Sequence, residues 1–563
     1  MNAKLKISKL ISLVILSFAI SAKSFCYQDN IEGHWEGMFM QQFRMEILFS
    51  VNEDEGLSGK IKMYDGSLLI QDDEINNIQC EKNSLSFLIP AKETAFKGQL
   101  SQDFSELNGD FIFPDGSHHP VYVAKKCTST LVENSLPSID GSILEKRYSA
   151  SQLKEDLQFL RSHLSEIHPQ YYLYTSEEAY DALYYSAIKN LDTDLTLREF
   201  YNLTSPIVGK TGCSHTGIRL PENYIMAQQT YTHYFPLKLF IEDDKAWVLG
   251  GIDDQVYIDS GSEIVRINHV PVENIIARLL SFIPAEGYNK TTKYYELNKD
   301  FSSYFNLLNN SEQFLIEYIK PGSQKLDSIN IEAVPYLSYS SSNTIDIPFL
   351  PTMHPMIMEQ STAILEIPSF ALPDVNEYLN LMDSIFQAIH KAGIQNLVLD
   401  LRGNHGGHPI FAAILYAHLS SKDFTYFQKN DQVPEFEPLY EPMEPATPNF
   451  TGKCYAIVDG GCLSTTGHLI SLLRYNNRAV FVGEEPGSWF YCNDNSKQYK
   501  LPNTQIEVNI PQTTFKTAVK GYKMGTPFIV DYPLDVSLED LKGKSDPRME
   551  YTLNMIRKSN RSL

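Results

Sequence analysis

The alternation of apolar and polar residues changes along the chain, and its first regime covers residues 31–126. Short runs alternate apolar with mostly polar residues, and turns such as Gly56 to Gly59 separate them. A period of two is typical of strands that bury one face, and regular short strands are typical of small barrels and sandwiches. The pattern therefore predicts an all-β accessory domain, barrel or sandwich, in which we find no constellation of catalytic residues. The clearest run is Phe43, Met45, Ile47, Phe49 and Val51.

Helical periodicity follows, after a linker at 127–148 that has little apolar periodicity. Ser149 and Gln152 have the spacing of a capping box, the reciprocal side-chain pair that begins many helices. Apolar residues then recur three and four positions apart, as on one face of a helix. We therefore predict a helical subdomain over 149–225. The first helical stripe is Leu153, Leu157, Leu160, Leu164 and Ile167.

The second half of the chain combines both periodicities. Residues 233–335 contain short alternating runs and one helical stretch at 272–280, which predicts a separate module. Residues 345–563 place continuous apolar runs, at 362–367, 397–399, 455–458 and 479–482, between helical patterns. Such runs are typical of buried strands. The sequence thus predicts a multidomain protein whose C-terminal part contains both buried strands and helices.

The first 26 residues have the pattern of a secretory signal peptide. Three lysines precede a short apolar stretch at 10–20, and small residues follow it. The stretch is too short for a stable transmembrane helix; a retained anchor is the alternative, and Cys26 leaves a lipid-anchored form open. No later stretch reaches a spanning length. We therefore expect a secreted, periplasmic or envelope protein without an integral membrane span after signal removal.

Composition narrows the partners. The net charge of −22 opposes binding to nucleic acid or to anionic membranes. The seven cysteines are too sparse for a disulfide scaffold and have no CxxC metal spacing. The motifs H-E-x-x-H and G-x-x-x-x-G-K-[ST] are absent as well, so neither metal nor cofactor is indicated. At 563 residues the chain should hold three or four domains. Its oligomeric state cannot be read from the sequence.

One stretch carries candidate chemistry. Ser464 stands between the predicted strand at 455–458 and a helical pattern that begins near His468. Backbone N–H groups at such a junction are unpaired and can hold an oxyanion. The alternative is that Ser464 merely caps the helix.

Two further motifs give this stretch a family resemblance. The run DLRGNHGG at 400–407 precedes the serine, and VGEE at 482–485 follows it. In this order and spacing they resemble the tail-specific (C-terminal processing) and tricorn-like serine peptidases. The resemblance implies a multidomain α/β protein with a crotonase-like α/β protease core over 345–563, and a peptide or protein substrate. The run at 261–268 similarly resembles PDZ-like modules, and residues 31–126 resemble lipocalin-like barrels.

The same resemblance supplies a candidate base. The run GKTGCSHTG at 209–217 is similar to the "GDxHT" segment of the tricorn-like branch, in which the histidine is the general base. It implies that Ser464 is the nucleophile and His215 its base. We expect the oxyanion to be held by backbone N–H groups, one from Thr465 and one from Gly406 or Gly407.

The sequence also departs from the family pattern. No lysine stands near Trp489, where the Ser–Lys branch carries one. Pro527 occupies the place of the tricorn-like orienting glutamate, which leaves Asp531 and Glu484 as candidates for that role. Gly467 replaces a glutamate three residues after the serine. These departures keep a second function open, a peptide-binding protein on an inactive peptidase scaffold.

Overall fold

The structure is a computed structural model, and it divides into two compact units, residues 1–136 and 137–563, which are described separately. It describes residues 31–561 except for 32, 40–42, 53–55, 66–67, 82, 93, 102–105, 114–117, 126–139, 253–256, 337–338, 340–356, 360, 372–373, 430–432 and 544. The predicted signal peptide and most of the predicted linker therefore lie outside the described residues. Within the described part, no helix is long and apolar enough to cross a membrane.

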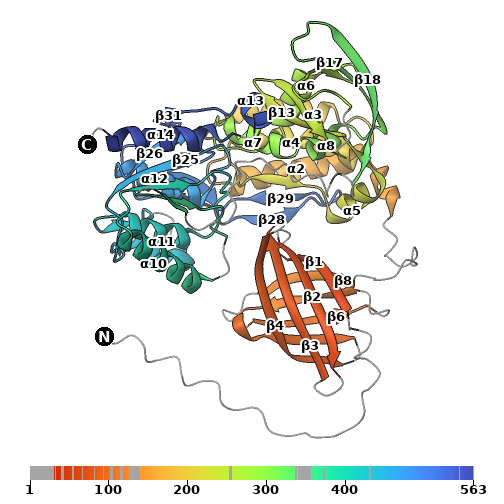
Figure 1. Ribbon diagram of the computed structural model, residues 1–563. Helices are drawn as coiled ribbons and strands as arrows, with labels where there is room; N and C mark the ends of the chain where they lie inside the picture. Colours follow the sequence, from red (N-terminus) through yellow and green to blue (C-terminus); the bar gives the residue numbers. More distant parts are fainter. Residues whose placement is uncertain are drawn as a thin grey trace, which may run out of the picture. The chain divides into compact units, whose positions relative to one another are not determined.

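The first unit is a closed antiparallel barrel of eight strands (Figure 1). Each strand pairs with the next along the chain, and β8 returns to pair with β1. The alternation seen in the sequence points large side chains inward, where Phe87 stacks on Phe96 at 4.6 Å between ring centroids. The strands are β1 (Gly33–Phe39), β2 (Phe43–Asn52), β3 (Gly56–Asp65), β4 (Leu68–Glu81), β5 (Ser84–Ile89), β6 (Thr94–Leu100), β7 (Glu106–Ile112) and β8 (His118–Lys125).

The second unit begins with a helical layer. Its first helix, α2 (Ala150–Ile167), starts with the capping box predicted for Ser149 and Gln152, and its leucine stripe is buried. The stripe packs against α3 (Glu177–Lys189), α4 (Leu197–Gly209) and α5 (Glu222–Tyr231) in one apolar cluster. The loop that carries His215 follows α4 and leads into the short strand β11 (Gly217–Arg219).

An antiparallel sheet follows, in the strand order β13-β14-β15-β17-β18 with the short β16 beside β15. Asn298 bonds both backbone groups of Ile241, donating to its carbonyl at 2.9 Å and accepting from its N–H at 2.7 Å. The backbone groups of Ile241 in β13 are therefore already hydrogen-bonded to a side chain of the protein itself. Its PDZ-like character remains a prediction. The elements are β13 (Leu237–Glu242), β14 (Lys245–Gly251), β15 (Glu263–Ile267), β16 (Val270–Pro271), α6 (Val272–Leu280), α7 (Thr291–Lys299), α8 (Phe301–Leu308), β17 (Gln313–Ile319) and β18 (Leu326–Glu332).

The α/β core is a six-stranded sheet in the order β20-β21-β22-β25-β26-β31, parallel except for β20. Helices α10–α12 lie on one side and α14 on the other (Figure 1). All five residues of β22 are buried, as expected for a strand covered on both faces. The elements are β20 (Ile357–Glu359), β21 (Thr362–Glu366), α10 (Val375–Lys391), β22 (Asn396–Asp400), α11 (Pro409–Leu419), β25 (Lys453–Val458), α12 (Thr465–Tyr475), β26 (Ala479–Gly483), β31 (Tyr532–Pro533) and α14 (Pro547–Arg561).

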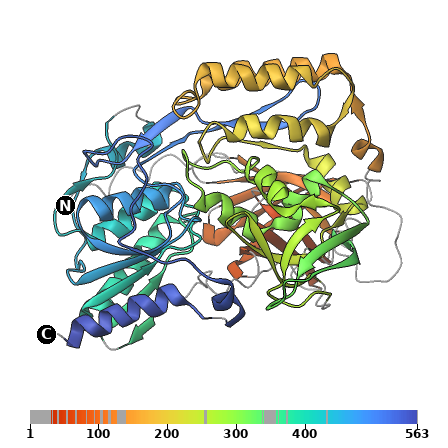
Figure 2. The same cartoon turned by 90° about the horizontal axis from the view of Figure 1, so that it is seen from above.

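A long hairpin joins this core to the helical layer. Strands β28 (Lys497–Lys500) and β29 (Glu507–Ile510) run along α2, and β29 pairs with β11 (Figure 2). The buried Asp156 of α2 accepts hydrogen bonds from the N–H groups of Asn503 and Thr504 at the hairpin tip, each at 2.8 Å. The hairpin therefore brings the loop before β11 to the carboxyl edge of the core sheet. The prediction of a β-rich N-terminal region followed by mixed α/β structure is confirmed.

Candidate active site

Ser464 occupies a strained turn between β25 and α12. Its backbone has φ +51° and ψ −121°, a conformation that a non-glycine residue adopts only at a cost. Although it stands at the N-cap position, its side chain makes no capping hydrogen bond. The alternative that Ser464 merely caps the helix therefore fails. The turn directs the hydroxyl away from the helix end.

His215 is the partner of that hydroxyl. Its Nε2 lies 3.1 Å from Ser464 Oγ, although 249 positions separate the two residues in the sequence. Asn509 of β29 donates a hydrogen bond to the His215 carbonyl at 2.8 Å. The hairpin thus holds the histidine loop from behind. The structure brings together the two residues that the sequence selected for the chemistry.

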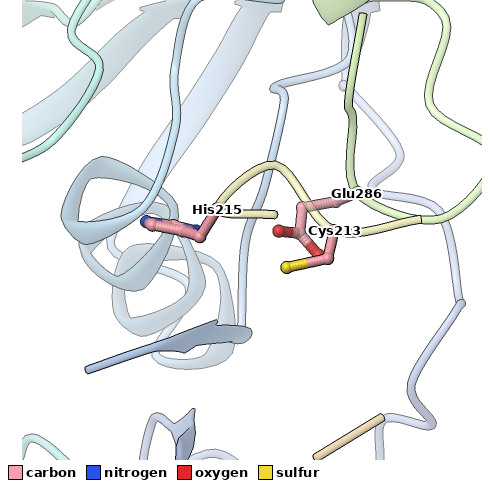
Figure 3. Close-up of side chains that lie close together, drawn as sticks. All are labelled: Cys213, His215 and Glu286. Atoms are coloured by element: carbon pink, nitrogen blue, oxygen red, sulfur yellow. The ribbon is translucent and has the colours of Figure 1, made fainter. Parts of the chain in front are cut away.

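The second ring nitrogen of His215 lies near two residues that the sequence analysis did not identify, Ser214 and Glu286. His215 Nδ1 lies 3.3 Å from Ser214 Oγ, which donates to Glu286 Oε1 at 2.7 Å. The Ser214 N–H donates to the same carboxylate oxygen at 3.0 Å. Figure 3 shows the Glu286 carboxylate beside Cys213. His215 extends from the loop that also carries Cys213. We call Ser214 and Glu286 the relay pair. Burial raises the pKa of Glu286, although His215 and the Ser214 bonds act in the opposite direction.

A second carboxylate lies near the reactive nitrogen. Asp494 Oδ2 is 3.7 Å from His215 Nε2, and the Asp494 side chain is 43% exposed. An ion pair of this kind forms only when the histidine is protonated, and solvent weakens it. No motif marked Asp494 in the sequence, because its position depends on how strand β27 (Tyr491–Asp494) pairs with β30 (Thr513–Lys516).

The two acids predicted to orient His215 serve other partners, so that prediction is wrong. Asp531 accepts from the Arg474 guanidinium at 2.7 Å and from the Phe481 N–H at 2.8 Å. Glu484 is hydrogen-bonded to Arg548. Both carboxylates therefore fasten the C-terminal segment to the core sheet. The relay pair takes the orienting position instead.

The glycine-rich turn after β22 lies directly against the serine. Gly406 has φ +100°, and a Cβ added there would lie 2.8 Å from the Cβ of Ser464. Its N–H, however, donates to the Asn404 side chain at 2.9 Å, so Gly406 is a poor oxyanion donor. Among the described residues the N–H groups of Gly407 and Thr465 make no hydrogen bond. This narrows the choice between Gly406 and Gly407 that the sequence left open.

A buried ion-pair network anchors the turn. Arg402 donates from Nε to Asp400 at 2.9 Å and from Nη1 to Asp546 at 3.0 Å. Burial alone would lower the pKa of Arg402, but the two carboxylates raise it above its ordinary value. The network therefore ties the glycine-rich turn to Asp546, just before α14.

The family departure at Gly467 has a steric reason. A Cβ there would lie 2.5 Å from the Ser488 hydroxyl and 2.6 Å from its backbone, so the first turn of α12 cannot carry a glutamate. Trp489, where the Ser–Lys branch carries lysine, is buried against Phe490 and Phe528. The two departures lie close together, because Ser488, which approaches Gly467, directly precedes Trp489.

Two cysteines near the serine are structural in character. Cys462, two residues before Ser464, is fully buried, and its thiol donates to the Leu401 carbonyl at 3.0 Å. Cys492 Sγ lies 3.2 Å from His468 Nε2. Burial raises the pKa of both thiols well above the ordinary value and lowers the pKa of His468 to about 3. Neither thiol is poised to ionise.

Comparison with known proteins gives one family match and several structural matches. Residues 361–517 match the sequence model of peptidase family S41. Mature CPAF is 12% identical with a TM-score of 0.52, over 71% of this chain and 95% of that one. The photosystem II D1 C-terminal processing protease is 13% identical with a TM-score of 0.36, over 68% and 93%. Tricorn protease is 13% identical with a TM-score of 0.32, over 93% and 46%. No curated protein matches.

The S41 match spans the glycine-rich turn, the serine and the strand that follows it, but not the loops that carry His215 and Glu286. The structural likeness to mature CPAF adds a shared fold over most of both chains. Residues 361–517 of this chain therefore form a region similar to the serine peptidases of family S41, and the chain shares the fold of mature CPAF.

Proposed function

We propose that the protein is an exported serine peptidase that hydrolyses peptide bonds with Ser464 as nucleophile and His215 as general base. The observation that carries the proposal is the 3.1 Å separation between His215 Nε2 and Ser464 Oγ, on a serine whose backbone is held out of helical geometry. Nucleophile and base within hydrogen-bond reach, with the base itself oriented, is the arrangement that activates a serine hydroxyl.

The reaction proceeds through an acyl-enzyme. The Ser464 hydroxyl gives its proton to His215 Nε2 while Oγ attacks the peptide carbonyl carbon. The imidazolium returns this proton to the leaving amine, and the C–N bond breaks. Water, deprotonated by the same nitrogen, then attacks the acyl carbon; the bond to Oγ breaks, the imidazolium returns its proton to Oγ, and the carboxylic acid leaves. Asp494 supports the imidazolium from 3.7 Å through solvent-screened attraction.

The oxyanion is held by the backbone N–H groups of Thr465 and Gly407. Both belong to segments that touch Ser464, the first turn of α12 and the glycine-rich turn. Negative charge appears on the carbonyl oxygen only as the tetrahedral state forms, so these donors favour the transition state over the substrate. Each donor contributes about 3 kcal/mol.

The relay pair positions the base. With a proton on Nδ1, His215 donates to Ser214 Oγ, and the Ser214 hydroxyl donates to Glu286 Oε1. This chain fixes the tautomer that leaves Nε2 free to accept from Ser464, and it stabilises the imidazolium. It does the work of the acid that family members carry near the C-terminus, from a different place in the sequence.

Glu286→Gln and Ser214→Ala are expected to lower kcat by about 100-fold or more with little change in KM. Because burial raises the pKa of Glu286, its carboxylate protonates at a higher pH than an ordinary glutamate. Glu286→Gln removes this titrating carboxylate, so the fall of the rate toward low pH should become shallower. A merely structural loss would instead lower the rate by the same factor at every pH. Glu485→Gln, a neighbouring acid without a bond to Ser214, is the control. Unchanged kcat in both relay variants would refute the positioning role.

Export rests on the charge and hydropathy pattern of residues 1–26.

The substrate class is peptide or protein. Incubation of the purified protein with unstructured peptides, read by mass spectrometry, tests the function. Cleavage that disappears in Ser464→Ala supports the peptidase. Intact peptides that nevertheless bind the protein would favour the alternative, a peptide-binding scaffold without activity.

A further inference from the structure

The proposed base, His215, lies close to two side chains of different chemistry, Cys213 and Glu286. Ligand atoms of Cys213, His215 and Glu286 all lie within 4.8 Å of one another, and Figure 3 shows the three residues together. We propose that these residues form an inhibitory site for a zinc-like divalent cation. The proposal concerns regulation of the site described above, so its inhibitory consequence rests on the proposed function, whereas the binding site itself does not.

The donor set suits such an ion. Thiolate, imidazole and carboxylate are the three ligand types of protein zinc sites, and a thiolate disfavours magnesium and calcium. Ligand atoms on one tetrahedral zinc lie about 3.3–3.6 Å apart, as Zn–ligand bonds of about 2.0–2.3 Å require. The present separations, at most 4.8 Å, need only side-chain rotations to close. Three protein ligands leave the fourth position to water.

The cluster contains unused binding capacity. Glu286 Oε2 is buried and makes no hydrogen bond to any described residue, although Oε1 accepts from Ser214. Glu286 itself is only 9% exposed. A buried carboxylate oxygen without a donor is costly, and a cation removes that cost. Cys213, at 0% exposure, presents its sulfur to the same space.

A cavity lies beside the cluster. Glu286 lines this cavity of about 150 Å³ together with Tyr288, which is 76% exposed. The volume exceeds that of several water molecules, so an ion has room next to the Glu286 carboxylate.

Metal binding and catalysis exclude each other in this arrangement. The Ser214 hydroxyl now bridges His215 Nδ1 and Glu286 Oε1, the two groups that the ion would take. An ion held by both would break the relay and withdraw His215 from Ser464. Zinc should therefore inhibit reversibly, and a chelator should restore activity. Cys213 adds the ligand that distinguishes this site from ordinary metal binding to an exposed histidine.

Cobalt(II) binding tests the site without any catalysis. Titration of Co²⁺ into Ser464→Ala should produce the thiolate-to-cobalt charge-transfer band and visible bands of tetrahedral cobalt. The band should vanish when Cys213→Ala is added and persist with Cys454→Ala, which removes a buried thiol elsewhere. Adding Glu286→Gln should weaken binding by about tenfold or more. No charge-transfer band in Ser464→Ala, or a band indifferent to Cys213→Ala, would overturn the proposal.

Inhibition tests the consequence. Half-inhibition by Zn²⁺, relative to each variant's own metal-free rate, should require at least about tenfold more zinc in Cys213→Ala than in the wild type or Cys454→Ala. Equal zinc sensitivity in all three proteins would refute the inhibitory role. If the wild type hydrolyses no peptide, the proposed function fails, and the cobalt titration still decides whether the metal site exists.

Discussion

Replacing Ser464 or His215 with alanine is expected to lower kcat/KM by about ten-thousandfold or more while leaving the fold intact. Ser464→Ala removes the atom that forms the acyl bond. His215→Ala leaves the hydroxyl as a weak nucleophile without a proton acceptor at 3.1 Å. Neither change opens a large cavity, because both residues are partly accessible. Steady-state hydrolysis of a peptide cleaved by the wild type measures the effect, and circular dichroism checks the fold.

The double variant carries more information than either single one. Because Ser464 and His215 act as one unit, the double variant should be little slower than either single variant. Ser471→Ala, which removes a buried hydroxyl further along the same helix, should retain turnover. Rates that multiply in the double variant would show that the two residues act independently. Near-normal turnover by Ser464→Ala would end the assignment.

The second large effect concerns stability. Arg402→Ala is expected to lower the free energy of unfolding by about 3–5 kcal/mol. Arg402 and Asp400 have side chains only 4% and 1% exposed, so removing the arginine leaves a buried, unpaired carboxylate. It also releases Asp546, which lies 2.8 Å from the guanidinium and ties the C-terminal segment to the core. Urea-induced unfolding measures the difference.

A matched change elsewhere separates this network from ordinary surface pairing. Arg266 also pairs with a carboxylate, Glu317 at 3.4 Å, but its side chain is 41% exposed. Arg266→Ala should therefore cost no more than about 1 kcal/mol. If Arg402→Ala costs as little as Arg266→Ala, the buried network does not anchor the glycine-rich turn.

The pattern of apolar and polar residues predicted those features that depend on residues close together in the sequence. Alternation marked the inward-facing residues of the strands at 31–126, and the leucine stripe after Ser149 marked the buried face of α2. Ser464 and His215 could be predicted because each lies in a motif whose order along the chain resembles that of a known family. The structure adds their 3.1 Å meeting, which no local pattern contains.

The orienting acid shows where such reasoning ends. Glu286 lies 72 positions from Ser214, in a loop without periodicity. It acquires its position only because this loop, which follows α6, contacts the histidine loop, where the Gly287 N–H donates to the Gly212 carbonyl at 2.9 Å. Asp531 and Glu484 were chosen by their places in motifs, but nearby arginines, Arg474 and Arg548, take up their charge. The Gly406 N–H likewise could not be excluded as a donor until its bond to Asn404 was visible.

The most direct test of the central claim, that Ser464 is an activated nucleophile, is covalent labelling with a fluorophosphonate followed by peptide mapping. The account predicts a single adduct on Ser464 in the wild type, formed much more slowly in His215→Ala, because the attacking hydroxyl then has no base. No adduct, or an adduct on another residue such as Cys462 or Thr465, would contradict it.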